Sequence, residues 1–361
     1  MVYYIRFLKQ PLIKRSGAKT YAATLITLTT DLGDDFFPYE VSLFATIIEQ
    51  DEYQWKEFLW RPHMRTLWIE LRIADVFQMP RTMTLLISPL RGTQGDRIRV
   101  DNMPEILGAR CPVVPLGGHV VADRVQRQLL TEQARIDVYE DMGESIARHI
   151  WDAGCALIAY LDKLLTDEAK EGKTDLETAS ALARRFRSAR LNGCRLLELG
   201  AGCGLVGIWM ASALPHCYIH LTDLPEAMGI LKFNVSQGRY ASESRTDTSV
   251  LDWSKEIPHD LQNQKYDLII VSDCTYNCDS IPLLVSKLEA LLDVSPQALA
   301  VVSMKTRHDS EAIFFDLMAK AGIRQLEKQE VMLPGRSHMD PGRSAETAQI
   351  FVFEKLTAPQ K

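Results

Sequence analysis

The chain has 361 residues, of which 46% are hydrophobic and 24% are charged, so it is long enough for one large globular domain and a smaller one. Its net charge of −6 argues against a general attraction for nucleic acid or for anionic membranes. Seven cysteines without a Cys-x-x-Cys pair argue against a disulfide framework or a zinc site and favour a reducing compartment, cytoplasmic or nuclear. No apolar run approaches the ~20 residues of a membrane helix, so we expect no membrane association and no secretory signal.

The first hundred residues have the composition of β-strands. Thr, Ile, Val and aromatic residues are concentrated at 21–29, 41–48, 67–73 and 83–87, and residues 67–73 alternate apolar and polar side chains. We therefore expect a small β-rich domain over residues 1–100. Its Trp55, Trp60 and Trp68 are more typical of a core than of a binding surface, and a role of this domain in substrate recognition is a hypothesis.

The middle of the chain predicts a connection followed by helices. Residues 101–133 are rich in Gly, Pro and Arg without periodicity, which is typical of an irregular arm between domains. Residues 143–165 have the apolar stripe of an amphipathic helix, within which we place Trp151. Residues 166–190 form a charged insertion with a helix, whose arginines are more typical of a solvated face than of an RNA-binding surface.

A glycine-rich stretch at 196–207 follows an apolar run and precedes helix-forming residues, which predicts a strand, a tight turn and a helix. Gly200, Gly202 and Gly204 lack a Cβ, so a flat ligand can lie against their backbone. The stretch also fits the G-x-G-x-x-G pattern of dinucleotide sites. Glu198 favours a cationic ligand over a pyrophosphate, and a turn that binds nothing is a further alternative.

From residue 194 onwards, strands and helices alternate. Expected strands are 194–199, 218–222, 249–251, 266–272, 298–303, 323–331 and 349–354, and expected helices are 205–214, 226–235, 282–292 and 311–321. This order predicts an α/β fold with a doubly wound, mainly parallel sheet and an antiparallel last strand, so that residues 134–361 form one domain. Ligands of such sheets bind at the carboxyl ends of the strands.

Polar and aromatic residues follow three of these strands. Asp223 is placed to accept hydrogen bonds from ribose hydroxyls, or alternatively to cap the next helix. Asp252 and Trp253 could flank an adenine, although the tryptophan could also simply cover the sheet. Asp273 and Tyr276 follow the fourth strand.

Several of these stretches resemble the family-16 protein methyltransferases, the mainly lysine-directed branch of the seven-strand class that uses S-adenosyl-L-methionine. The resemblance covers roughly residues 135–355 and includes Ile150-Trp-Asp-Ala-Gly, Glu198-Leu-Gly-Ala-Gly, Asn234, Asp273-Cys-Thr-Tyr and Lys305-Thr-Arg. It implies a seven-strand Rossmann-like sheet and contact of Trp151 with the cofactor. The expected cofactor-binding residues are Trp151, Glu198, Gly200, Ala201, Gly202, Gly204, Asp223, Asp252, Trp253 and Ser272, and the expected catalytic residues are Asp273 and Tyr276.

The sequence thus predicts a protein N-methyltransferase that acts on a lysine, with arginine or histidine as open alternatives. The methyl group of the cofactor is already activated, so positioning of a neutral amine suffices, and no metal is required. In this interpretation Asp273 orients the amine and Tyr276 packs against its stem. Two other classes remain alternatives: a nicotinamide-dependent oxidoreductase that uses the same glycine turn, and a non-catalytic cofactor-binding scaffold. We expect a monomer that acts on a protein substrate. Nucleic acid is a less favoured substrate.

Overall fold

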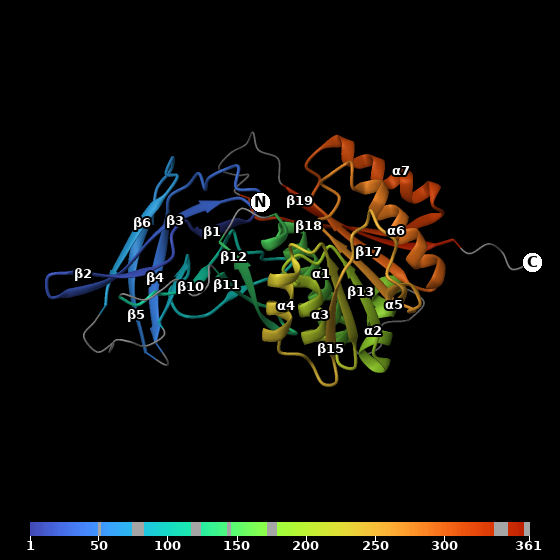
Figure 1. The fold of residues 1–361 in the computed structure, drawn as a ribbon, viewed down its shortest axis with the longest axis horizontal. Helices are drawn as coiled ribbons and strands as arrows, with labels where there is room; N and C mark the ends of the chain where they lie inside the picture. The colour runs from blue at the N-terminus through green and yellow to red at the C-terminus, as the bar shows by residue number, and fades with distance from the viewer. Residues whose placement is uncertain are drawn as a thin grey trace, which may run out of the picture. The chain divides into compact units, whose positions relative to one another are not determined.

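The computed structural model describes residues 1–49, 52–73, 83–116, 124–142, 146–171, 179–335 and 346–356 (Figure 1). The chain divides into two compact units. Unit 1 comprises Met1–Arg97, Pro104–Leu130 and Asp137–His149, and unit 2 comprises Ile98–Met103, Thr131–Ile136 and Ile150–Lys361. Residues 143–145 of the expected helix, 172–178 of the expected insertion and 336–345 between the last two expected strands lie outside the described residues.

The first twelve strands form two sheets. They are β1 (Tyr3–Phe7), β2 (Leu12–Ser16), β3 (Lys19–Thr29), β4 (Val41–Glu49), β5 (Glu52–Trp60), β6 (Leu67–Arg72), β7 (Thr84–Ser88), β8 (Asp96–Arg97), β9 (Ile106–Leu107), β10 (Ala109–Pro112), β11 (Arg124–Leu130) and β12 (Arg135–Asp141). One sheet has the order β2-β3-β1-β9 with β6 also paired to β3, and the other has the order β12-β11-β10-β7-β4-β5 with β8 paired to β11. The expectation of a β-rich N-terminal region is confirmed.

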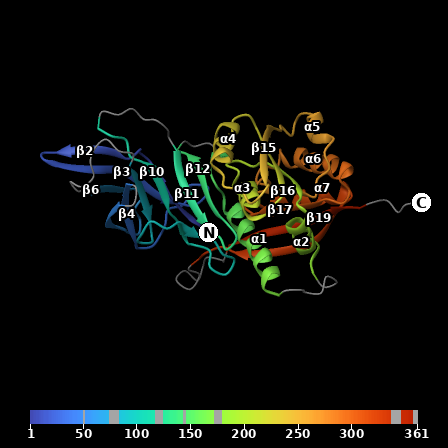
Figure 2. The same ribbon diagram turned by 90° about the horizontal axis from the view of Figure 1, so that it is seen from below.

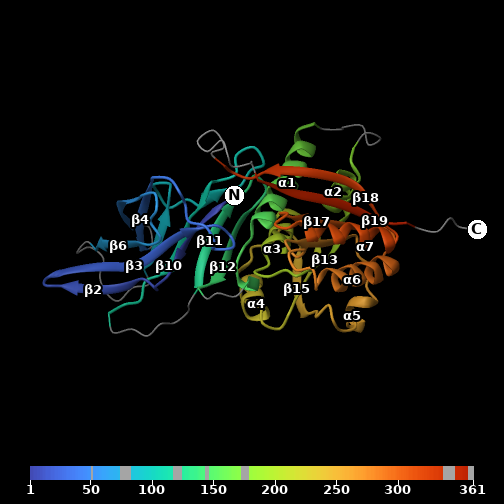
Figure 3. The same cartoon turned by 90° about the horizontal axis from the view of Figure 1, so that it is seen from above.

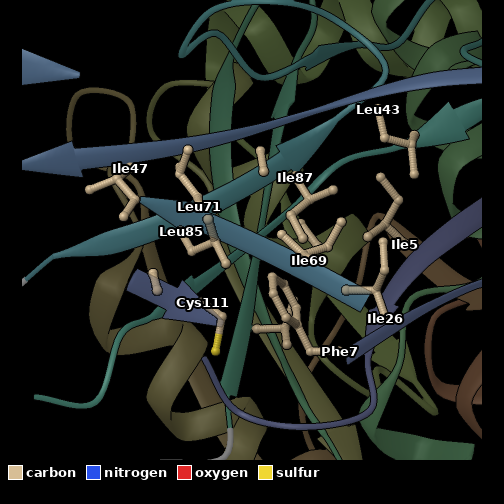
Figure 4. Packing of buried hydrophobic residues seen from close by; sticks show 14 of the residues in the cluster. Ile5, Phe7, Ile26, Leu43, Ile47, Ile69, Leu71, Leu85, Ile87 and Cys111 are labelled. Atoms are coloured by element: carbon tan, nitrogen blue, oxygen red, sulfur yellow. The ribbon is translucent and has the colours of Figure 1, made fainter. Parts of the chain in front are cut away.

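Unit 1 has its own hydrophobic core. Ile26 of β3, Ile69 of β6 and Leu85 of β7 are fully buried and point into it (Figure 4). Trp60 belongs to this core, where its indole Nε1 donates a hydrogen bond of 2.9 Å to the Phe37 carbonyl oxygen. Trp68 instead is 42% exposed, with the Lys14 ammonium 4.4 Å from the centre of its ring. The three tryptophans therefore do not share one role.

The expectation of an irregular arm at 101–133 was wrong for much of that segment, since β9, β10 and β11 lie within it. The pattern was missed because β11 carries a charge inside the unit. Arg127 is fully buried, and its Nε lies 2.8 Å from Oε2 of Glu140, so a cation interrupts the apolar alternation that would mark a strand.

The expected helix at 143–165 was also wrong at its start. A short 3-10 turn, η1 (Ile146–Arg148), comes first, and helix α1 (Asp152–Glu171) begins at Asp152. Trp151 therefore precedes the helix. Its carbonyl oxygen accepts hydrogen bonds from the backbone N–H groups of Gly154 and Cys155, at 3.1 and 3.2 Å, as at a helix start.

Unit 2 contains one seven-strand sheet. Its strands are β13 (Arg195–Leu199), β14 (Tyr218–Asp223), β15 (Arg245–Val250), β16 (Leu268–Ser272), β17 (Leu299–Met304), β18 (Ile323–Met332) and β19 (Thr347–Lys355). Their order is β15-β14-β13-β16-β17-β19-β18, and β19 runs antiparallel to both of its neighbours, whereas the other neighbouring pairs are parallel. The predicted doubly wound sheet with an antiparallel last strand is confirmed.

Helices cover both faces of this sheet. They are α1, α2 (Ala181–Asn192), α3 (Leu205–Ala213), α4 (Met228–Gln237), α5 (His259–Gln262), α6 (Ile281–Val294) and α7 (Ile313–Lys320), with the 3-10 turn η2 (Asp309–Ala312) before α7. Figures 2 and 3 show α6 and α7 on one face and α1 on the other. Among the residues that the structure describes, no helix has the length and apolar character needed to cross a membrane.

The arginines of the charged segment lie on α2, whose N-cap is Ser180. Nη1 of Arg185 lies 3.2 Å from Oδ1 of Asp267, and Nη1 of Arg190 donates to the Leu165 carbonyl oxygen at 3.4 Å. These two side chains therefore bind to groups of their own unit, whereas the sequence predicted a solvated face.

Candidate active site

The glycine turn between β13 and α3 has the tight backbone that its sequence predicts. Gly200, Gly202 and Gly204 have φ of 68°, 56° and 80°, in the left-handed region that favours glycine. A Cβ on Gly200 would lie 2.5 Å from Sγ of Cys274 and 3.3 Å from the ring of Trp253. The turn is thus a cradle in which only backbone fits, and the Trp253 ring lies against it.

Asp223, the last residue of β14, closes this turn. Its Oδ2 accepts from the backbone N–H of Gly202 and its Oδ1 from that of Leu224, both at 2.6 Å. Burial raises the pKa of Asp223. The alternative role as a helix cap is contradicted, because α4 begins at Met228 and its N-cap is Ala227. Ala201 is anchored to the same strand, since its N–H donates to the Thr222 carbonyl oxygen at 3.0 Å.

Glu198 lies underneath the turn rather than facing solvent. It is 2% exposed, and its Oε2 accepts a 2.9 Å hydrogen bond from the N–H of Gly207 in the first turn of α3. Burial, together with the nearby Asp223 carboxylate, raises the pKa of Glu198 to about 8. A dinucleotide pyrophosphate would need the N–H groups at this helix start. Because the glutamate already holds one of them, the geometry argues against the oxidoreductase alternative.

Asn234 in α4 supports the turn from the other side. Its fully buried Nδ2 donates a 2.8 Å hydrogen bond to the Cys203 carbonyl oxygen. The sequence marked this asparagine only through the family resemblance. In the structure it orients the backbone of the glycine turn.

Asp252 and Trp253 follow β15, as expected, but their side chains differ in direction. The Asp252 Oδ1 accepts from the N–H and the hydroxyl of Ser254, at 2.9 and 2.7 Å. These bonds, with Lys255 nearby, lower the pKa of Asp252 to about 2. The carboxylate therefore stabilises its own surface turn, while the neighbouring Trp253 reaches the glycine cradle.

Asp273 follows β16 in a strained conformation, with φ of 55° and only 7% of its surface exposed. Two Arg307 nitrogens, Nη1 and Nη2, lie 2.5 Å from Oδ1 and 3.1 Å from Oδ2 of this carboxylate. The Arg307 guanidinium carbon lies 5.6 Å from the centre of the Trp151 ring. Arg307 thus connects two expected site residues, although the sequence offered it only as part of a resembling segment.

Two further expected residues lie around Asp273. Tyr276 is 50% exposed. Partial burial of its hydroxyl is the main cause that raises its pKa, and the nearby Cys274, Asp223 and Asp273 add to this effect. The hydroxyl oxygen of Ser272 is buried without a hydrogen-bond partner and would lie 3.4 Å from a Cβ on Gly154. A buried polar atom of this kind fits a site that is completed by a polar ligand.

These features fit S-adenosylmethionine. The glycine turn accepts a flat group against its backbone. The acidic side chains of Asp223 and Glu198 are bonded to backbone N–H groups of this segment, and Ser272 offers an unsatisfied hydroxyl. No group of three or more potential metal ligands occurs among the described residues. The seven-strand sheet with this site at the carboxyl ends of its strands defines the class of S-adenosylmethionine-dependent methyltransferases.

The comparison with known families gives the particular branch of this class. The profile of a family described as lysine methyltransferase matches residues 130–321, more than half of the chain. The chain belongs to this family.

Curated relatives match about half of the chain. A UPF0665 family protein of Schizosaccharomyces pombe is 31% identical over 48% of this chain, and the match spans 47% of that protein, about half of its length. Protein N-lysine methyltransferase METTL21A of Danio rerio is 31% identical over 47% of this chain and 65% of its own. EEF1A lysine methyltransferase 3 of Xenopus tropicalis is 26% identical over 55% of this chain and 75% of its own.

Among solved structures, an arsenic(III) S-adenosylmethionine methyltransferase of Chlamydomonas reinhardtii aligns with a TM-score of 0.36 and 17% identity. The alignment covers 48% of this chain and 66% of that one.

Proposed function

We propose that this protein transfers a methyl group from S-adenosylmethionine to the side-chain amine of a lysine in a protein substrate. Membership of the lysine methyltransferase family supports the reaction, and the names of two relatives support a protein as the acceptor. The single observation that carries the proposal is the assembly of the glycine cradle, Asp223 and Asp273 at the ends of adjacent strands.

Each part of the site has a proposed task in holding the cofactor. Asp223 would accept the ribose hydroxyls, because each of its oxygens has a further lone pair beside the backbone hydrogen bond it already accepts. Trp253 and the glycine turn would enclose the adenine end, and the Ser272 hydroxyl would complete the polar contacts. Glu198 and Asp252 would act less directly, since the first supports the turn and the second forms the turn that presents Trp253.

When bound, S-adenosylmethionine supplies a methyl carbon activated by a sulfonium, so the bond from nitrogen to carbon forms as the bond from carbon to sulfur breaks. The protein contributes position and electrostatics. Tyr276, half exposed at the rim, would pack against the lysine stem, and Asp273 would face the amine from the end of β16. The amine must arrive neutral, and its proton passes to water.

Radiolabelled methyl transfer tests the proposal. The full chain is incubated with labelled S-adenosylmethionine and EEF1A, which gives one relative its name, and with a protein lysate. Labelled methyl-lysine after hydrolysis supports the proposal, whereas methyl-arginine or methyl-histidine would move it to another side chain. Cofactor binding in calorimetry without any labelled protein would favour a scaffold.

We propose a monomer in the cytoplasm or nucleus, which sedimentation and imaging of a tagged chain would test.

A further inference from the structure

The carboxylate of Asp273 is already held by several protein groups. Besides the two Arg307 contacts at 2.5 and 3.1 Å, its Oδ2 lies 3.4 Å from the backbone nitrogen of Ala153. Its backbone N–H donates to the Ser303 carbonyl oxygen at 2.8 Å. The left-handed φ of 55° persists because these contacts determine the conformation. Asp273 is therefore fixed before any substrate arrives.

Arg307 is fixed in its turn by the segment that follows β17. The backbone N–H groups of Arg307 and His308 both donate to Oε1 of Glu311, at 3.0 Å each. Glu311 is 1% exposed, so this support is buried. The guanidinium consequently approaches Asp273 from a loop held by Glu311 and makes two parallel bonds, the geometry that gives arginine–carboxylate pairs their directional precision.

The same region holds the start of α1. The Ser303 hydroxyl donates to the Ala153 carbonyl oxygen at 2.8 Å, and the Lys305 ammonium lies 3.0 Å from Oδ2 of the fully buried Asp152. Trp151, the residue just before this helix, has its ring beside the Arg307 guanidinium. One polar cluster thus joins the ends of β16 and β17 to the entry of α1.

We propose that Arg307 is a positioning residue, which fixes the Asp273 carboxylate and the Trp151 ring in the orientation that the reaction requires. The inference rests on the proposed methyl transfer and adds a residue to it. Arg307 acts through Asp273 and Trp151 rather than on the amine itself. Its loss should therefore reduce turnover more than it reduces cofactor binding.

Two substitutions at this position test the inference. Arg307→Gln should lower kcat by about 100-fold through misalignment. The KM for the protein substrate should change by less than about 3-fold, and the cofactor Kd, to which the Trp151 contact would contribute, by less than about 10-fold. Arg307→Lys keeps the charge but not the two parallel bonds, and it should lower kcat by about 10-fold. The matched control is Arg324→Gln, which removes an equal charge from an exposed ion pair with Glu354 and should leave kcat unchanged.

A double-mutant cycle separates joint action from independent roles. Asp273→Asn with Arg307→Gln replaces the charged pair by two neutral amides, so no uncompensated charge is buried. If the pair acts as a unit, the double variant should lose about as much kcat as each single variant. Losses that multiply, or wild-type rates in both Arg307→Lys and Arg307→Gln, would overturn the inference. The inference would also be overturned if Arg307→Gln lowered kcat and cofactor affinity by the same factor and lowered the melting temperature as well.

A spectroscopic measurement does not depend on activity. The emission of Trp151 is obtained by subtracting the spectrum of a Trp151→Phe variant, in the wild-type and in the Arg307→Gln background. A shift to longer wavelength in the Arg307→Gln background is expected as the ring loses its neighbour, and an unchanged difference spectrum would contradict the contact. A wild-type protein without methyl transfer would refute the proposed function, whereas an active wild type with an equally active Arg307→Gln refutes only the role of Arg307.

Discussion

At the scale of single residues, the site uses carboxylates in two ways. The buried Glu198 and the surface Asp252 hold backbone turns, whereas Asp223 and Asp273 are the two carboxylates that we propose to face the ligands. Sequence position alone predicted all four acids at strand ends or in the glycine turn. It could not separate these roles, because the direction of each side chain depends on groups distant in the sequence: Arg307 is 34 residues from Asp273.

Asp223→Ala should weaken S-adenosylmethionine binding by about 10- to 100-fold, or ~1.5–3 kcal/mol, because the ribose acceptors and the bond to the Gly202 N–H are lost together. Isothermal calorimetry measures this directly. Asp247→Ala, which removes an exposed carboxylate on the neighbouring β15, serves as the control. An unchanged affinity in Asp223→Ala would remove the ribose role.

Glu198 should give the unliganded protein a pH-dependent stability. Its pKa of about 8 in the folded protein is above its ordinary value of 4.5, so the folded state holds this proton more tightly than the unfolded state. Its contribution to stability is complete below about pH 4.5 and is lost as the pH rises through about 8. Glu198→Gln, which keeps an acceptor for the Gly207 N–H, should flatten this part of the curve of melting temperature against pH. An unaltered slope in that variant would contradict the assignment.

At the scale of elements, the strands of unit 2 were predictable because several are apolar throughout and end in turn residues, as in 268–272. Elements were missed or misplaced where a buried charge interrupts the pattern. The charge of Arg127 interrupts the apolar pattern of β11, so this strand was not predicted. The start of α1 was predicted too early, because the sequence does not show that Lys305 pairs with Asp152 at the true start. Such pairs bring together residues that are far apart in the chain.

The start of α1 depends on that pair. Lys305→Met should lower the free energy of unfolding by about 3–5 kcal/mol, because it withdraws the ammonium from a fully buried carboxylate. Lys163→Met on the same helix removes an exposed i,i+4 pair with Asp167 and should cost less than ~1 kcal/mol. Urea denaturation of both variants compares the two effects. Equal costs would show that burial of the Asp152 pair is unimportant for α1.

At the scale of the whole molecule, each of the two units has a hydrophobic core of its own among the described residues. One is built from the strands of unit 1 and includes Trp60, and the other lies between the unit 2 sheet and helices α6 and α7. The candidate cofactor site belongs entirely to unit 2. A ligand that binds only there should stabilise that unit, while a change in the other core should leave the cofactor affinity intact.

Calorimetric unfolding of the full chain tests this separation with one ligand and one variant. S-adenosylmethionine at 100 times its Kd should stabilise unit 2 by about 2.7 kcal/mol and raise its melting temperature by roughly 5–10 °C.

Arg127→Met should act on unit 1 instead. Burial alone would raise the pKa of Glu140, but Arg127 and His149 lower it, so loss of the arginine leaves a poorly compensated buried carboxylate and should cost about 3–5 kcal/mol. The cofactor Kd of Arg127→Met at 25 °C should remain that of the wild type. A single transition shifted as a whole by both the ligand and the substitution would show that the two cores unfold together.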